Sequence, residues 1–289
     1  MILITGATGT TGRDVVRELA SLGATGVRVM VRDPSKADFI READFEVVGG
    51  DFDRPETLDA ALWSVERAFL LTAPSPQTTE HQSRFIEAAR RAGVRHVVKF
   101  SAFGASAAAP GGFTKWHGDA EEELKASGLA YTMLQPNSFM QNLLGQARAI
   151  AAEGRIYQAV GDARASFVDT RDVAAVAARV LTEDGHEGQA YDITGPEALS
   201  YYDVAERLSA ALGRQITYVP ITPEDFRRGA LAAGLPEWLV EALGLLNETL
   251  AAGRAAAVTD VVREVGKTEP RTLEQFARDY ASAFKSRES

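Results

Sequence analysis

The segment MILITGATGTTG, which runs from Met1 to Gly12, is the most informative part of this chain about its fold. Its apolar run, Ile2–Ile4, is typical of a short buried strand, and the residues after it favour a turn into a helix over about 10–22. Glycines recur at every third position of the turn, as Gly6, Gly9 and Gly12. Glycines at this spacing between a strand and an amphipathic helix predict a dinucleotide-binding site.

Each glycine has its own physical role in such a site. Gly6 lets the chain turn sharply off the strand, Gly9 lacks the Cβ that would keep the backbone from a pyrophosphate, and Gly12 lets the helix lie close to the sheet. The free N–H groups and the positive dipole end of the helix then face the phosphates. Further hydroxyl donors are Thr8, Thr10 and Thr11. A purely structural turn is the weaker interpretation, because the predicted strand and helix on either side supply the expected context.

The residue directly after the second predicted strand, over 27–31, is expected to select between NAD(H) and NADP(H). An NAD-specific fold has an acid about twenty residues beyond the last glycine, whereas this chain has Arg32 there. A guanidinium can hold a 2′-phosphate bidentately, and Lys36 is a second cation nearby. Asp33 could face the ribose instead, or belong to a turn with Pro34. We expect NADP(H) as the preferred cofactor, with NAD(H) as the alternative.

Composition excludes several classes of protein. The chain has 289 residues, of which 45% are hydrophobic, and no apolar run approaches the ~20 residues that cross a bilayer. A functional turn at residue 6 leaves no room for a signal peptide, so we expect a soluble cytoplasmic protein. Cysteine is absent and the four histidines form no ligand pair, which argues against a metal site. A net charge of −9 without a dense basic run argues against nucleic-acid binding.

The first half alternates short apolar strands with helices, which predicts an α/β protein with a Rossmann-type, doubly wound parallel sheet. From about residue 155 this rhythm loosens. We expect an NAD(P)-binding Rossmann domain over 1–154 and a smaller mixed substrate lobe over 155–289, packed on the first and interleaved with it. The apolar helix over 239–250 could cap a substrate pocket or form a dimer interface, so both a monomer and a homodimer remain open. The strands expected in the first half are 2–5, 27–31, 45–48, 68–71, 96–100 and 131–134.

Ligands in doubly wound sheets lie at the carboxyl ends of the strands, so the residues after each strand are candidate contacts. Asp51 and Phe52 follow the third strand, where they could bind and stack on the adenine. The alternative is that Asp51 only starts the next helix. Small residues follow the fourth strand and would admit the nicotinamide ribose, unless this is an ordinary loop. They are Thr72, Ala73 and Pro74.

Several longer motifs extend over nearly the whole chain. They are GATGTTG, VRDP, GDF, FSAFGA, HGDAEEELKASGLAYTMLQPNSFMQN, DTRDVA and YDITGPEALSYYDVAERL. With these motifs the chain resembles the NmrA-like branch of the atypical short-chain dehydrogenase/reductase superfamily, which includes NADPH-dependent quinone reductases and triphenylmethane-dye reductases. The resemblance implies that the loop after the sixth strand closes over the nicotinamide end and that Ser101 stands where relatives polarise a carbonyl. The loop residues are Pro136, Asn137 and Phe139.

The chain departs from the superfamily at the proton donor. Carbonyl-reducing members carry Tyr-x-x-x-Lys on the helix after the fifth strand, and here the corresponding segment begins at Phe113, which cannot donate a proton. All seven tyrosines lie at or after residue 131. Lys115 and His117 are therefore the catalytic candidates, either to hold the nicotinamide ribose or to supply a proton. A solvated helix start explains Lys115 equally well.

These observations favour an NADPH-dependent oxidoreductase that transfers a hydride to a quinone or another small, conjugated aromatic acceptor. Such acceptors take a hydride readily, and their reduced products can take protons from water. The alternative is a non-catalytic redox sensor that binds NADP(H) and transmits its occupancy to a partner. The absent tyrosine argues against an isomerase or epimerase of nucleotide-sugars, because such an enzyme needs that residue.

Overall fold

Seven strands form the main sheet of the computed structural model, which describes residues 1–37, 40 and 43–285. Their order across the sheet is β3-β2-β1-β4-β5-β6-β9, and the pairs from β3 to β6 are parallel. Every residue of β2 and of β5 is buried, as expected for strands covered on both faces. The strands are β1 (Ile2–Ile4), β2 (Val27–Val31), β3 (Glu46–Gly49), β4 (Arg67–Leu70), β5 (His96–Phe100), β6 (Ala130–Pro136) and β9 (Gln189–Ile193).

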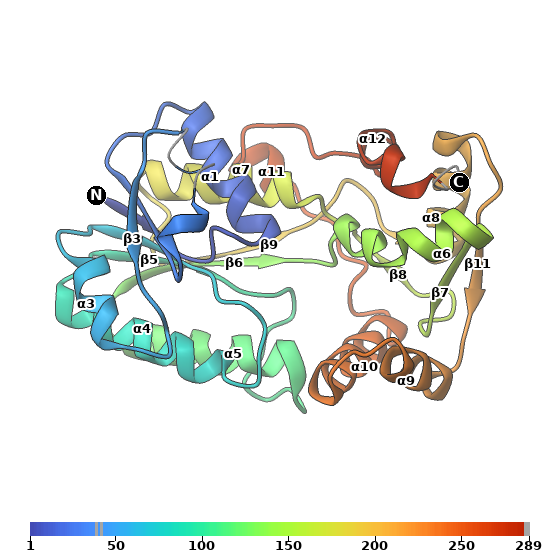
Figure 1. Ribbon diagram of the computed structural model, residues 1–289, viewed down its shortest axis with the longest axis horizontal. Helices are drawn as coiled ribbons and strands as arrows, with labels where there is room; N and C mark the ends of the chain where they lie inside the picture. The colour runs from blue at the N-terminus through green and yellow to red at the C-terminus, as the bar shows by residue number, and fades with distance from the viewer. Residues whose placement is uncertain (38–39, 41–42, 286–289) are drawn as a thin grey trace. The chain divides into compact units, whose positions relative to one another are not determined.

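Helices cover both faces of this sheet. Figure 1 shows α1 (Thr10–Ser21), α7 (Thr170–Thr182) and α11 (Val261–Glu264) on one face. The other face carries α3 (Glu56–Leu62), α4 (Thr78–Ala92) and α5 (Gly112–Ala126), while the short η1 (Pro34–Lys36) follows β2. The doubly wound Rossmann-type fold predicted from the sequence is confirmed. The strand Gln189–Ile193, which lies in the expected second lobe, adds to the main sheet beside β6.

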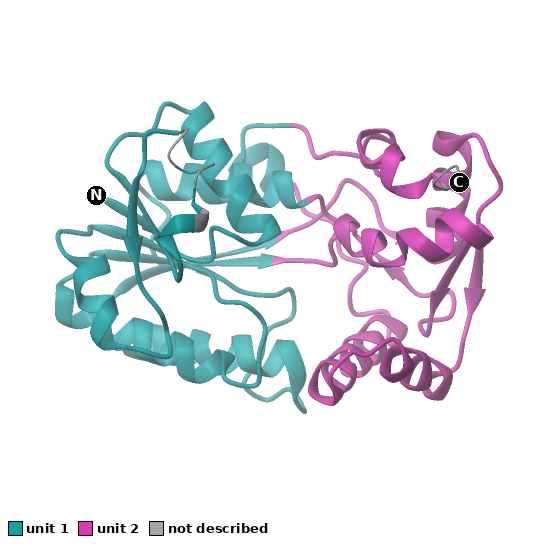
Figure 2. Cartoon of the chain, viewed as in Figure 1, with its two compact units in different colours: residues 1–135, 170–192, 261–268 teal, residues 136–169, 193–260, 269–289 magenta. Residues whose placement is uncertain are grey.

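The chain divides into two compact units (Figure 2). Unit 1 comprises residues 1–135, 170–192 and 261–268, and unit 2 comprises residues 136–169, 193–260 and 269–289. Each unit is therefore assembled from three separate segments of the chain. Unit 1 contains the glycine turn and five complete strands of the main sheet, β1 to β5, together with all but the last residue of β6 and of β9.

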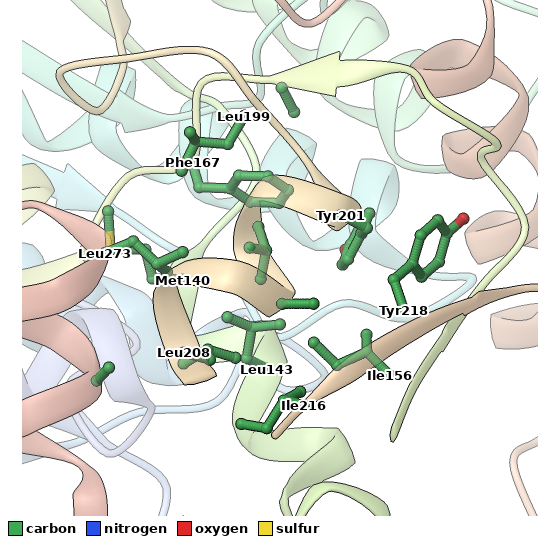
Figure 3. Packing of buried hydrophobic residues seen from close by; sticks show 14 of the residues in the cluster. Met140, Leu143, Ile156, Phe167, Leu199, Tyr201, Leu208, Ile216, Tyr218 and Leu273 are labelled. Atoms are coloured by element: carbon green, nitrogen blue, oxygen red, sulfur yellow. The ribbon is translucent and has the colours of Figure 1, made fainter. Parts of the chain in front are cut away.

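Unit 2 has its own apolar core, in which Phe167, Tyr201 and Tyr218 lie among aliphatic side chains (Figure 3). Two small sheets pair β10 (Leu199–Ser200) with β8 (Arg164–Ala165) and β11 (Thr217–Pro220) with β7 (Arg155–Gln158). Capping boxes form at two helix starts of this unit, Ser200 with Asp203 and Thr272 with Gln275. The helices of this unit are η2 (Met140–Gln146), α6 (Ala147–Glu153), α8 (Tyr201–Leu212), α9 (Pro223–Ala232), α10 (Glu237–Ala251), α12 (Leu273–Asp279) and η3 (Ala281–Phe284).

Two kinds of feature are absent from the described residues. No helix among them is both long enough and apolar enough to cross a membrane. The same residues bring together no group of three or more histidine or carboxylate side chains that could hold a metal ion.

Candidate functional site

The strand order of the main sheet reverses between β1 and β4, which lie side by side. Open parallel sheets bind ligands outside the carboxyl ends of their strands at such a switch point. Two predicted cofactor segments meet here, because the glycine turn follows β1 and Thr72 follows β4 closely. The hydroxyl oxygen of Thr5 joins them, since it lies 2.9 Å from the Leu71 carbonyl oxygen.

Gly6 and Gly12 bring backbone segments closer together than any side chain would allow. Gly6 has a φ of +68°, and a Cβ there would lie 2.7 Å from the Leu71 carbonyl oxygen. A Cβ on Gly12 would lie only 2.2 Å from the carbonyl oxygen of Gly6. The N–H of Gly9 donates to that same oxygen at 3.0 Å. The packing of the start of α1 onto the turn therefore requires glycine at both positions.

The N-terminus of α1 is built to receive an anion. Gly9 is its N-cap residue, and no side chain caps the helix. Thr8, Gly9 and Thr10 are exposed, whereas Thr11 and Gly12 are buried. N–H groups in the first turn of an uncapped helix bind phosphate oxygens well. The geometry of the turn and helix thus fits the pyrophosphate of a dinucleotide.

Arg32 follows β2 directly and is exposed. It forms no hydrogen bond or ion pair with another described residue, so its guanidinium is available for a 2′-phosphate. Asp33 instead accepts hydrogen bonds from the N–H and hydroxyl of Ser35, at 3.1 and 2.6 Å. It thereby caps η1, which is the turn role considered for it from the sequence. The side chain of Lys36 lies outside the described part of the structure.

The predicted adenine residues occupy the turn after β3. The Asp51 carboxylate accepts a hydrogen bond from the Asp53 N–H at 3.0 Å, and the Phe52 ring stacks on His81 with a centroid separation of 5.9 Å. His81 Nε2 lies 2.8 Å from the Asp53 carboxylate. The hydrogen bond with His81 lowers the pKa of Asp53, and neighbouring positive charges lower it further. Phe52 and His81 thus form a flat, half-buried pair beside an acidic turn.

Small residues follow β4, as the sequence indicated. Ala73 and Pro74 are exposed, while Thr72 is buried and accepts a 2.9 Å hydrogen bond from the amide of Gln82. The amide oxygen of Gln82 is enclosed and has no partner among the described residues. A buried amide oxygen of this kind is costly unless water or a ligand completes its bonding.

The three candidates from the loop after β6 belong to unit 2. Pro136 ends β6 and is buried, and Phe139 is half-buried immediately before η2. The Asn137 amide donates to the Ser166 hydroxyl at 2.7 Å and to the Ala255 carbonyl at 2.8 Å. Both amide hydrogens of Asn137 are therefore used within unit 2.

The catalytic candidates Lys115 and His117 lie on α5 but contact different partners. The Lys115 ammonium donates to the Asp119 carboxylate at 2.9 Å and to the Ala107 carbonyl at 3.1 Å. This is the solvated helix role that was considered for it. His117 Nδ1 lies instead 3.1 Å from Nζ of Lys99, inside unit 1.

Lys99 is completely buried at the carboxyl end of β5. Besides His117, its ammonium lies 3.3 Å from the Phe100 carbonyl oxygen and 3.3 Å from Oγ of Ser101. The three N–H bonds of an ammonium group thus have three acceptors. His117 is half-buried, and its Nε2 makes no hydrogen bond to another described residue.

A carboxylate completes this cluster. Glu121 is buried one helical turn beyond His117 on α5. It accepts hydrogen bonds at Oε1 from the Ser101 hydroxyl at 2.5 Å and from the Gln135 amide at 2.9 Å. Ser101, a predicted cofactor residue, therefore lies between the buried ammonium and the buried carboxylate.

Burial governs the charge of the cluster. It lowers the pKa of Lys99 from its ordinary value of 10.5 to about 7, and the carboxylate of Glu121 offsets only part of this effect. Burial also lowers the pKa of His117 well below 6.5, and the neighbouring charge of Lys99 lowers it further. His117 is therefore neutral at pH 7, while Lys99 exchanges its proton near that pH.

Sequence reasoning missed Lys99 and Glu121 as functional candidates. For Lys99 the sequence contains a signal. Lys99 is the one charged residue in the run VVKF, and its side chain cannot reach solvent from a parallel strand that is covered on both faces. Glu121 gives no comparable signal, since acidic residues also flank it in the run AEEEL.

The lowered pKa of Lys99 predicts a pH-dependent stability. The unfolded chain binds a proton at Lys99 up to about pH 10.4, so between pH 7 and 10 it binds more protons than the folded chain. Stability should therefore rise with pH in this window. We expect the unfolding free energy of the wild type, measured by urea denaturation, to gain on the order of 3 to 5 kcal/mol over Lys99→Met between pH 6.5 and 10. Lys267→Met, which removes an exposed ammonium, is the control, and a flat difference for Lys99→Met would contradict the prediction.

Comparisons with known proteins agree with this geometry. A family profile described as NAD(P)H-binding matches residues 6–184. The NAD(P)H azoreductase of Xenophilus azovorans is 40% identical over 284 residues, which cover 98% of this chain and 99% of that protein. An NADPH-dependent quinone oxidoreductase from Escherichia coli, solved with NADPH, has a TM-score of 0.90 at 29% identity, covering 97% of this chain and 100% of that chain. The Citrobacter triphenylmethane reductase complexed with NADP(H) has a TM-score of 0.86 at 25% identity, with coverages of 97% and 100%.

Proposed function

The chain belongs to the NAD(P)H-binding family, in its NmrA-like branch of atypical short-chain dehydrogenases/reductases, and from this membership we propose a finer function. Membership makes it an NAD(P)H-dependent oxidoreductase. The proposal is that it uses NADPH to reduce quinones or other small conjugated aromatic acceptors. The named activities of its relatives, on azo compounds, quinones and triphenylmethane dyes, support an acceptor of this class.

The observation that carries the proposal is the replacement of the proton-donating tyrosine. Phe113 lies at the start of α5, and its ring packs edge-on against Trp116 at a centroid distance of 5.6 Å. A ketone needs strong acid assistance as it is reduced, because its alkoxide product is very basic. Quinones and cationic dyes give far more stable products. A site with an aromatic pair in place of a phenol therefore favours flat acceptors that readily take a hydride.

The residues of unit 1 have separate roles in this reaction. The glycine turn and the N-terminus of α1 hold the pyrophosphate, and the proposed role of Arg32 is to hold the 2′-phosphate. NADPH, when bound, supplies the hydride. Ser101 directly follows β5, and His117, on α5, contacts Lys99 near the end of that strand, so both would orient the nicotinamide end and the acceptor. This arrangement supports NADPH over NADH.

A panel of acceptors tests the proposal. The purified protein is mixed with NADPH and, in turn, a benzoquinone, an azo dye and a cationic triphenylmethane dye, while the loss of NADPH absorbance and the binding of NADPH by fluorescence are followed. We expect NADPH binding and turnover with at least one acceptor. Binding without turnover of any acceptor would overturn the reductase proposal and favour the redox sensor. A simple aliphatic ketone is the control acceptor, and it should not be reduced.

A further inference from the structure

The cluster around Lys99 contains a feature that the proposed function leaves unexplained. A lysine and a histidine, both cationic residues in many proteins, face each other at 3.1 Å in a buried site. Two positive charges at this distance would repel each other strongly where little water screens them. One of the two groups must therefore be neutral and accept a hydrogen bond from the other.

The hydrogen-bond directions determine which group accepts. With Lys99 as an ammonium, its three N–H bonds match the three acceptors Phe100 O, Ser101 Oγ and His117 Nδ1. His117 Nδ1 then carries no proton, so the ring proton sits on Nε2. This nitrogen has no partner among the described residues and is not one of the enclosed polar atoms. A neutral imidazole is thus held with its Nε2–H free to donate.

The same contacts also suit the opposite state. If a proton moves from Lys99 to His117, the Nδ1–H donates to the lone pair of a neutral amine. The two remaining N–H bonds of that amine still reach Phe100 O and Ser101 Oγ. Because neither state loses a hydrogen bond, the proton can shift without rearrangement of the cluster.

We propose that Lys99 and His117 form a buried proton relay, in which Lys99 passes a proton to His117 Nδ1 while His117 Nε2 gives its proton to the reduced acceptor. This inference rests on the proposed function, and it supplies the proton donor that Phe113 cannot provide. A quinone gains a hydride, with two electrons, from NADPH, and its developing oxyanion takes the Nε2 proton. The N–H bond of Lys99 breaks as the Nδ1–H bond forms, so the products are a hydroquinone, NADP⁺, neutral Lys99 and neutral His117 with its proton on Nδ1. A solvent proton then binds the accessible Nε2 while the Nδ1 proton returns to the buried Lys99 amine, which restores the resting state.

The groups around the relay support these roles. The nearest negative charge is that of Glu121, which Ser101 and Gln135 hold by hydrogen bonds and which favours the protonated form of Lys99. Lys125 lies 4.0 Å from the second oxygen of Glu121. Burial raises the pKa of Asp192, and the charge of Glu121 raises it further. Lys99 and Glu121 are positioning residues here, and His117 is the group that contacts the acceptor.

Two acceptors with different proton requirements test the relay. A quinone requires a hydride and a proton, whereas a cationic triphenylmethane dye becomes a neutral product by taking a hydride alone. We expect Lys99→Met and His117→Gln to lower kcat for the quinone about 100-fold, the usual range for loss of a general acid, and to change kcat for the dye less than about 3-fold. Arg95→Met, which removes an exposed cation immediately before β5, is the matched control and should change neither rate.

Two further readouts separate the relay from a structural role. The wild-type kcat for the quinone should fall as the pH rises through about 7, where Lys99 loses its proton, and Lys99→Met should lack this step. In the cofactor-free protein, ¹⁵N NMR of the histidine rings should show His117 as the Nε2–H tautomer in the wild type. Lys99→Met should give a mixture of tautomers, since Nδ1 has lost its donor.

Each outcome bears on one proposal. Split rates for the two acceptors, with unchanged NADPH binding by fluorescence, support the relay. Parallel loss of both rates, no loss of either, or an Nδ1-protonated His117 in the wild type would overturn the relay and leave the reductase proposal intact. A wild type that binds NADPH but reduces neither acceptor would overturn the reductase proposal and, with it, the relay.

Discussion

Replacing Gly12 by alanine is expected to abolish high-affinity NADPH binding and to destabilise unit 1. The new Cβ would lie 2.2 Å from the Gly6 carbonyl oxygen and 2.8 Å from Cα of Ala7, which are backbone atoms that no rotamer change can move away. The start of α1 must therefore shift from the turn. Overpacking of this kind costs about 1 to 3 kcal/mol, and the shift also removes the helix N–H groups from the phosphates. We expect about a 100-fold weaker Kd for NADPH by fluorescence titration, together with a lower Tm.

Two other glycines serve as controls for Gly12→Ala. Gly229 lies in α9, where an added Cβ meets open space, so Gly229→Ala should leave NADPH binding unchanged and stabilise the helix by about 0.5 to 1 kcal/mol. At Gly9 a Cβ would meet only the Gly6 carbonyl oxygen at 3.4 Å. Gly9→Ala should therefore keep the wild-type Tm while weakening NADPH binding. If Gly12→Ala keeps the wild-type Kd and Tm, the close packing assigned to this turn is wrong.

Replacing Arg32 by glutamate is expected to move the cofactor preference from NADPH toward NADH. Arg32 is exposed directly after β2 and makes no ion pair with another described residue, so the substitution leaves no buried partner unpaired. A guanidinium forms two charge-assisted hydrogen bonds to a phosphate, each worth about 1.5 to 3 kcal/mol. A glutamate instead repels the 2′-phosphate and can accept hydrogen bonds from ribose hydroxyls. We expect the ratio of Kd for NADPH to Kd for NADH to rise about 100-fold or more.

The control for Arg32→Glu carries the same charge change at a distant place. Arg95 is exposed immediately before β5, at the amino end of the sheet, where it pairs with Glu66 at 3.7 Å. Arg95→Glu should leave the ratio of the two Kd values unchanged. An unchanged ratio for Arg32→Glu as well would place the 2′-phosphate elsewhere, and Lys36 would then be the next residue to substitute.

The sequence was most informative where structure depends on neighbours along the chain. The strands 27–31 and 96–100 were predicted with the bounds that the structure has, because short segments rich in valine between polar turns are typical of buried parallel strands. Asp33 is a second example of a local effect. An acid directly before a proline is typical of a turn, and in the structure Asp33 caps η1. The place of the strand Gln189–Ile193 beside β6 depends instead on pairing between segments more than fifty residues apart.

Some site residues were predicted only from their place relative to the strands and helices. The side-chain contacts in the structure were needed to tell which role each of them has. Lys115 and His117 differ by two positions on one helix, so the sequence offered both as catalytic residues. The structure directs Lys115 to Asp119 and His117 to Lys99, because residues two apart on a helix point to different faces. Asn137 was expected at the cofactor, and its amide hydrogens are used within unit 2 by Ser166 and Ala255.

The Rossmann-type sheet and the glycine turn at Gly6 to Gly12 were predictable from the amino-acid sequence, because glycine spacing and apolar periodicity are local properties of the chain. The buried cluster at the end of β5 was not predictable in this way, since it depends on contacts between distant residues. Lys99, on β5, meets His117, on α5, across eighteen residues, and Glu121 joins them through Ser101. Burial then excludes water from the cluster and thereby sets the charge of its members. How deeply a residue is buried depends on the folded chain around it, so the residue type alone does not reveal it.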